Sequence, residues 1–191
     1  MSGQPLRTVV ADTSALVSLA VPRADGATDA DTPDPLQYVL TSCDVFVPPE
    51  VVTELSDIAH YQNIHAAAAS TALAARTHYT VEDPYTREDT MDSRPTFGLD
   101  DGETDGTVLA NALDVDGVCT DEFGGTNFPL IHAVLQGPRI VPTPRLICDY
   151  ARNGHMTHEE ARRLITAIGS HRSWENSPYV TQLLQRLDAD T

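Results

Sequence analysis

Four acidic side chains, far apart in the chain, occupy positions from which they could act together: Asp12, Glu54, Asp105 and Asp121. Asp12 and Asp121 each follow a short run that predicts a buried β-strand. Ligands of open parallel sheets bind outside the carboxyl ends of the strands, so both carboxylates are expected at one edge of a sheet. Either Asp alone could simply begin a turn or cap a helix, but two on the same edge favour a site.

Glu54 is placed by helical geometry. It lies at the margin of an apolar stripe expected on one helix face, formed by Val51, Val52, Leu55, Ile58 and Ala59. Residues three and four apart share a helix face, so Glu54 lies beside Val51 and Ile58. From this margin of the buried face its carboxylate can point along the sheet toward Asp12. The alternative is a partly exposed Glu that reaches into water.

Asp105 is expected on the buried face of another helix, together with Val108, Leu109 and Ala112. A charge on a buried face is costly unless it is paired or bound to a metal. The alternative is a first-turn Asp favoured by the helix dipole. Glu103, two residues earlier, has a competing structural role, since Asp100 and Glu103 have the spacing of a capping box.

Carboxylates that converge without bases raise each other's pKa, and a divalent cation relieves that repulsion. Oxygen ligands favour Mg²⁺ or Mn²⁺ over zinc. A water held by such a metal can attack a phosphodiester while the metal stabilises the developing charge. The acidic cluster therefore indicates metal-dependent hydrolysis.

The elements that would position these acids alternate between strands and helices, which predicts an α/β fold with a parallel sheet. Residues 21–35 and 82–98 are polar; we interpret the first as a loop and the second as a linker between two halves of one domain. We expect residues 1–142 to form the domain and residues 143–191 to form a helical extension packed on it. Strands are expected at 8–11, 44–47, 117–120 and 139–142.

The charge of the chain is strongly negative: 28 acids face 12 bases, for a formal net charge of -16. All the bases are Arg, and Lys is absent. This composition predicts a host that keeps its proteins in concentrated salt. An acidic protein should repel nucleic acid, but in molar salt the Debye length is about 3 Å, so the net charge does not exclude an RNA substrate.

The N-terminal residues resemble no signal peptide, and no run of about 18 apolar residues predicts a membrane span. We therefore expect a cytoplasmic protein that does not enter membranes. The three cysteines, Cys43, Cys119 and Cys148, are well separated in the sequence, which predicts free thiols and argues against a zinc site.

Four segments, taken in order, resemble the PIN-domain family of nucleases, including the archaeal and VapC-like members. They are Val-Val-Ala-Asp12-Thr-Ser, Val-Pro-Pro-Glu-Val-Val-Thr-Glu54-Leu, Gly-Glu103-Thr-Asp105-Gly, and Val-Cys-Thr120-Asp121-Glu122-Phe. The resemblance implies a Rossmann-like α/β/α sandwich with about 4–5 parallel strands. It also implies Mg²⁺- or Mn²⁺-dependent hydrolysis of RNA. Together with the acidic, Lys-free composition, the resemblance leads us to expect a halophilic archaeon as the source.

The resemblance also implies roles for individual residues. The first, second and fourth acids of the family fall on Asp12, Glu54 and Asp121, with Glu122 as a neighbour or substitute for the last. The third falls on Asp105 or Glu103, and the expected position of Asp105 on the buried face of its helix favours Asp105. Three hydroxyl residues would orient the carboxylates or water: Thr13, Ser14 and Thr120.

Three further readings stay open. The chain could be the toxin of a toxin–antitoxin pair, with an antitoxin protein as partner, and two copies could form a homodimer. It could also be a catalytically silent PIN-like module that serves in RNA processing or as an interaction scaffold. Trp174 could stack on a base, although packing of the tail against the domain is the favoured interpretation.

Overall fold

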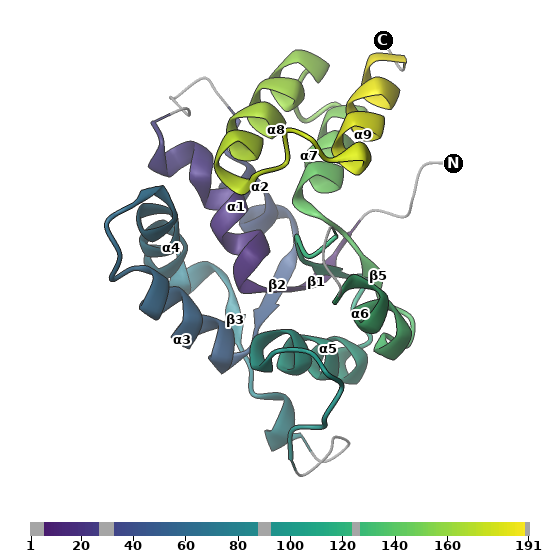
Figure 1. The fold of residues 1–191 in the computed structure, drawn as a ribbon. Helices are drawn as coiled ribbons and strands as arrows, with labels where there is room; N and C mark the ends of the chain where they lie inside the picture. Colours follow the sequence, from purple (N-terminus) through teal and green to yellow (C-terminus); the bar gives the residue numbers. More distant parts are fainter. Residues whose placement is uncertain (1–5, 27–32, 88–92, 124–126, 190–191) are drawn as a thin grey trace.

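The computed structural model describes residues 6–26, 33–87, 93–123 and 127–189 (Figure 1). Its five strands form one all-parallel sheet in the order β3-β2-β1-β4-β5. The strands are β1 (Thr8–Ala11), β2 (Asp44–Val47), β3 (Thr80–Val81), β4 (Gly117–Cys119) and β5 (Arg139–Ile140). The α/β class and the parallel sheet expected from the sequence are confirmed.

Helices cover both faces of the sheet, which makes a three-layer α/β/α sandwich of the Rossmann-like kind. The α-helices within the described ranges are α1 (Thr13–Ala24), α2 (Pro35–Ser42), α3 (Pro49–Ile58), α4 (Ile64–Ala74), α5 (Asp101–Leu113), α6 (Phe128–Val134), α7 (Thr143–Arg152), α8 (His158–Arg172) and α9 (Pro178–Ala189). In Figure 1, α5 and α6 lie on the opposite side of the sheet from α1 and α8.

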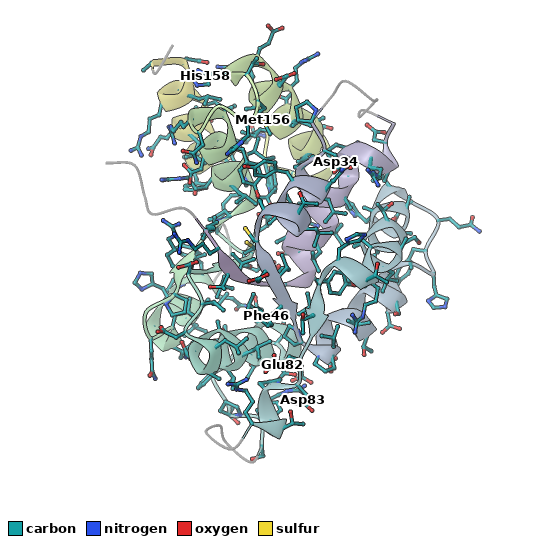
Figure 2. The ribbon with its side chains drawn as sticks, turned by 180° about the vertical axis from the view of Figure 1, so that it is seen from behind. Asp34, Phe46, Glu82, Asp83, Met156 and His158 are labelled. Carbon is teal, nitrogen blue, oxygen red and sulfur yellow. The ribbon has the colours of Figure 1, made fainter. Side chains whose placement is uncertain are left out.

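The two faces of the sheet are set by the alternation of side chains along each strand. Val9 and Ala11 belong to the main core, which they share with helices α1, α4, α7 and α8. Val10 and Val118 point the other way and pack with Leu109 of α5. Phe46, labelled on β2 in Figure 2, packs against this second cluster.

The strand order reverses beside β1. The chain runs from β1 outward to β2 and β3, then returns to pair β4 with the other side of β1. Such a reversal opens a crevice at the carboxyl ends of the two central strands, where ligands of this kind of fold bind. Asp12 and Asp121 follow the two strands that meet there.

Two features differ from the sequence expectations. The prediction that a loop begins at residue 21 was wrong, because helix α1 continues through Pro22 to Ala24. Val21 and Pro22 are buried, so packing holds them in the helix despite the hydrogen bond that Pro cannot donate. The segment 82–98, which we interpreted as a linker, contains the short 3₁₀ turn Pro84–Thr86, which follows β3. It also contains Arg94, which forms ion pairs with α5. Residues 88–92 of that segment, and Gly124 and Gly125, lie outside the described residues.

The C-terminal helices share the main core. Leu146 of α7 and Leu164 and Ile168 of α8 lie in the same buried cluster as the residues of α1. Trp174 is 7% exposed and its ring lies 5.7 Å from that of Phe123, so it packs the tail against the domain. Met156 and His158 mark this helical region, at the opposite end of the molecule from Asp83 (Figure 2). Within the described ranges, no helix is long and apolar enough to cross a membrane.

Candidate active site

Asp12 lies at the junction of β1 and α1. Its backbone N–H donates to the carbonyl of Cys119 at 3.0 Å, which extends the pairing of β1 with β4. Its carboxylate caps α1 by accepting from the Ala15 N–H at 2.8 Å and from the Ser14 hydroxyl at 2.9 Å. With 7% of its surface exposed, Asp12 is held in one orientation at the crevice.

Asp121 lies beside Asp12 across the same edge. The Ser14 hydroxyl that donates to Asp12 also accepts from the Asp121 N–H at 2.9 Å, so one side chain joins the two segments. Oδ1 of Asp121 accepts from the Thr143 N–H at 2.8 Å. Its Oδ2 is buried and, among the described residues, has no hydrogen-bond partner.

Glu54 reaches the crevice from α3. The Thr13 hydroxyl, at the start of α1, donates to Oε2 of Glu54. Gly102 of α5 faces the same carboxylate, and a Cβ atom built there would overlap it, with Cδ of Glu54 only 3.0 Å away. The glycine therefore leaves the space that Glu54 occupies.

Glu103 enters from the first turn of α5. The capping box expected from the sequence is present: the Glu103 N–H donates to Asp100 at 2.8 Å and the Asp100 N–H donates to Oε2 of Glu103 at 3.2 Å. Asn127 also donates to Oε2, at 2.8 Å. Oε1 is buried and lacks a hydrogen-bond partner in the described part of the chain. Capping thus uses one oxygen of Glu103 and leaves the other available.

These side chains surround a pocket of about 470 Å³, which we call the main pocket. Its lining residues include four of the predicted acids, Asp12, Glu54, Glu103 and Glu122, and also Thr13, Ser14, Tyr61, Asn63, His65, Asp100, Gly102 and Arg172. Asp121 lies next to Asp12 but lines a neighbouring pocket of about 450 Å³, the second pocket, together with Trp174 and Ser177. His65, Glu122 and Arg172 line both pockets.

Asp105 does not line either pocket. It is buried, at 4% exposure, as the helical-face argument expects. Its partner is Arg94, whose Nε and Nη2 donate to its two oxygens at 2.8 and 2.7 Å. The Tyr85 hydroxyl donates to it as well, at 2.6 Å. The structure thus brings Glu103, and not Asp105, together with Asp12 and Glu54.

Burial raises the pKa of the four carboxyl groups at this edge. For Asp12 the pKa rises to about 7, because burial and the charge of Asp121 outweigh the hydrogen bonds from Thr120, Ala15 and Ser14. Burial likewise raises the pKa of Asp121. The rise is partly offset by the polar hydroxyl of the neighbouring Ser18, by the hydrogen bond from the Thr143 N–H and by the charge of Arg172.

Glu54 and Glu103 behave in the same way. Burial raises the pKa of Glu54, against the hydrogen bond from Thr13, and the charges of Asp100, Glu50 and Glu103 raise it further. Burial also raises the pKa of Glu103, which feels the charges of Asp100 and Glu122. Neighbouring negative charges thus add to the effect of burial, from Asp121 on Asp12 and from Asp100 on both Glu54 and Glu103, so this edge disfavours four charged carboxylates.

A divalent cation suits this donor set, although the side chains are not gathered around a single point. Within the described ranges, no three His, Cys, Asp or Glu side chains stand close enough to hold one metal ion as they are. At this edge two buried carboxylate oxygens, on Glu103 and Asp121, lack hydrogen-bond partners among the described residues, and the carboxylates supply hard oxygen ligands of the kind Mg²⁺ and Mn²⁺ take. Mg²⁺ retains several waters and binds through one or two carboxylates, so ligation partly through water fits these residues.

Several residues of the main pocket were not among the predicted site residues. Arg172 brings a positive charge to the pocket from the end of α8. Asn127 does not line the pocket but positions Glu103 by donating to its Oε2. Tyr61 is 68% exposed at the pocket, and Asn63 caps α4 by accepting from the Ala66 N–H. The capping spacing of Asp100 and Glu103 was a signal for their placement; no local pattern marked Arg172 or Asn127.

Comparison with models of protein families, with curated proteins and with solved structures found no match to this chain.

Proposed function

We propose that this protein is an Mg²⁺- or Mn²⁺-dependent endoribonuclease that hydrolyses RNA phosphodiesters at the main pocket. The observation that carries the proposal is the convergence of Asp12, Glu54 and Glu103, from three separate elements, on one pocket at the topological switch point. Acids that cost free energy to bury together are a mark of function, since perturbed carboxyl groups cluster at active sites.

The residues divide into two roles. Asp12 and Glu103 of the main pocket and Asp121 of the second pocket would hold the metal, directly or through water, with Glu122, which lines both pockets, beside them. The metal, when bound, supplies an activated water and stabilises negative charge on the phosphate. The first turn of α5 thus contributes Glu103 in place of Asp105, which the sequence favoured and which is already paired with Arg94.

Glu54 is placed to orient water and to accept a proton. Its raised pKa makes its carboxylate a stronger base than an exposed Glu, which suits a general base near neutral pH. Thr13 donates to one of its oxygens and so fixes its orientation. Ser14 does the same for Asp12, so the two residues that follow Asp12 each orient one acid.

RNA as the substrate rests on the resemblance of the four acidic segments to the PIN-domain family. Hard, carboxylate-held metals are used for phosphoryl transfer, which agrees with a phosphodiester substrate. The net charge of -16 opposes nucleic-acid binding in dilute buffer, so the proposal includes a concentrated-salt environment where that repulsion is screened.

A second candidate is a PIN-like module without catalytic activity. The observation that favours it is that, in the described part of the chain, no three ligand side chains are gathered for one metal ion. Titration of the purified protein with Mn²⁺, followed by the electron paramagnetic resonance of the free ion, separates the two. The nuclease should bind Mn²⁺ and lose that binding when Asp12 is replaced by Asn, and it should cut RNA only with metal. A folded protein that binds no Mn²⁺ would favour the silent module.

A further inference from the structure

Arg172 brings a guanidinium group to the acidic crevice. It is the last residue of α8, and it lines the main pocket together with Asp12 and Glu54. It also lines the second pocket, which contains Asp121 and Trp174. Arg172 therefore stands between the two pockets, next to the acids proposed to hold a metal.

The guanidinium of Arg172 has no partner within the protein as far as the structure describes it. It makes no hydrogen bond or ion pair with any described residue, and its Nε is buried without an acceptor. Its charge lowers the pKa of Asp121 without forming a salt bridge. By contrast, Arg94, Arg145 and Arg162 are each paired with carboxylates. A buried donor without an acceptor is costly, which points to an acceptor that arrives with a ligand.

Phosphate is the acceptor whose chemistry fits this position. A guanidinium offers a planar fork of N–H groups that can donate to two oxygens of a phosphate at once. A neighbouring carboxylate site with a divalent cation would bind the same kind of group. A free anion would need only one of the two pockets, whereas a strand with successive phosphates can occupy both.

An aromatic side chain lines each of the two pockets. Tyr61, 68% exposed, lines the main pocket, and its ring is available for a base to stack on. Trp174 lines the second pocket and is the single tryptophan of the chain. Because Trp174 is buried against Phe123, it is suited to report occupancy of the second pocket.

We propose that Arg172 binds a phosphate of a single-stranded RNA that runs from the main pocket, past Arg172, into the second pocket. This inference rests on the proposed function and deepens it, because it names the cation that holds the strand and the path that the strand takes. Arg172 acts on binding, so its loss should raise KM or Kd more than it lowers kcat.

The test measures binding of a fluorescein-labelled single-stranded RNA of about eight nucleotides, in EDTA and molar KCl so that no cleavage occurs. Arg172→Ala and Arg172→Gln should each weaken binding about tenfold or more, as expected for a charge-assisted pair, and Arg172→Lys should weaken it less. Arg163→Ala, an exposed arginine on the same helix, is the matched control and should leave Kd unchanged. Saturating RNA should also change the Trp174 fluorescence of the unmodified protein.

Equal Kd values for folded Arg172→Gln and the unmodified protein would overturn the role of Arg172. Unchanged Trp174 fluorescence at saturating RNA would overturn the path through the second pocket. Cleavage with Mn²⁺, measured separately, distinguishes this failure from that of the proposed function. If RNA is cut but its Kd does not depend on Arg172, only this inference is contradicted. If binding depends on Arg172 but no RNA is cut, this inference is supported and the proposed nuclease activity is contradicted.

Discussion

Glu103 and Asp105 stand two positions apart in the first turns of α5, and their carboxylates meet different surroundings. Glu103 lines the main pocket and keeps one buried oxygen without a partner in the described part of the chain. Asp105 forms a two-point ion pair with Arg94 and accepts a hydrogen bond from Tyr85. The same helix thus supplies one acid to the candidate site and another to the pairing with Tyr85 and Arg94.

The first prediction separates these two roles. Glu103→Gln should abolish metal-dependent RNA cleavage with little loss of stability, because the amide keeps the size of the side chain while the metal loses a charged ligand. Asp105→Asn should retain most of the cleavage but lower the free energy of unfolding by about 1–3 kcal/mol, since it weakens a buried charge pair. Cleavage rates and urea unfolding of both variants provide the check. A stable but inactive Asp105→Asn protein would return the third acid to Asp105.

The second prediction concerns the space in front of Glu54. Gly102→Ala should reduce cleavage because the added methyl group displaces the Glu54 carboxylate. The control is Gly106→Ala on the same helix, where the nearest contact of a new Cβ would be an ordinary 3.8 Å to Val10. Both changes replace a helical Gly with Ala, which favours the helix by about 0.5–1 kcal/mol. If the two variants cleave RNA at the same rate, the packing of Gly102 against Glu54 has no functional role.

The third prediction is a pH dependence of stability in the metal-free protein. The pKa of Asp12 rises from 3.8 to about 7 on folding. At a pH between these two values, Asp12 is therefore protonated in the native state but ionised in the unfolded state. The contribution of Asp12 is therefore fully present below pH 3.8 and is lost as the pH rises through about 7. In EDTA and molar KCl, the free energy of unfolding should fall from pH 5 to pH 8, by at most about 1.4 kcal/mol per pH unit for this group.

Asp12→Asn is the control for that slope, since the amide does not titrate. The slope should be shallower in this variant, and saturating Mn²⁺ should raise the stability of the unmodified protein most at pH 8. Identical slopes for the two proteins in urea unfolding would show that Asp12 does not titrate as described.

The fourth prediction concerns salt. The acidic chain without Lys should lose structure in dilute buffer, as repulsion among its carboxylates is no longer screened, and should recover in molar KCl. Far-ultraviolet circular dichroism between about 0.05 and 3 M KCl follows this directly. Full stability in dilute buffer would contradict the assignment to a concentrated-salt environment.

Part of this arrangement could be predicted because it depends on local periodicity. Asp12 and Asp121 follow strands, and parallel strands share an edge, so their proximity follows from topology. Glu54 was placed by the apolar stripe of its helix, and it does line the main pocket. The hydroxyls of Thr13 and Ser14 follow Asp12 directly in the sequence, and both bond to carboxylates of this edge.

The rest depends on contacts between distant segments, which no local pattern encodes. The helical spacing of Asp105 predicted its burial correctly, but the ion pair with Arg94, 11 residues earlier, is a contact that this spacing does not encode. Arg172 reaches the crevice only because α8 packs on α1. Strand β3, Thr80–Val81, is two residues long and is defined by its pairing with β2, so its own sequence carries too little signal.

The measurement that tests the central claim most directly is the cleavage of RNA by purified protein in about 2 M KCl. Reactions with Mn²⁺, with Mg²⁺ and with EDTA would be compared for the unmodified protein and for Asp12→Asn, with circular dichroism to establish that both are folded. We predict cleavage with either metal, none in EDTA, and loss of activity in Asp12→Asn. Cleavage that persists in EDTA or in Asp12→Asn would contradict a metal-dependent reaction at the carboxylate pocket.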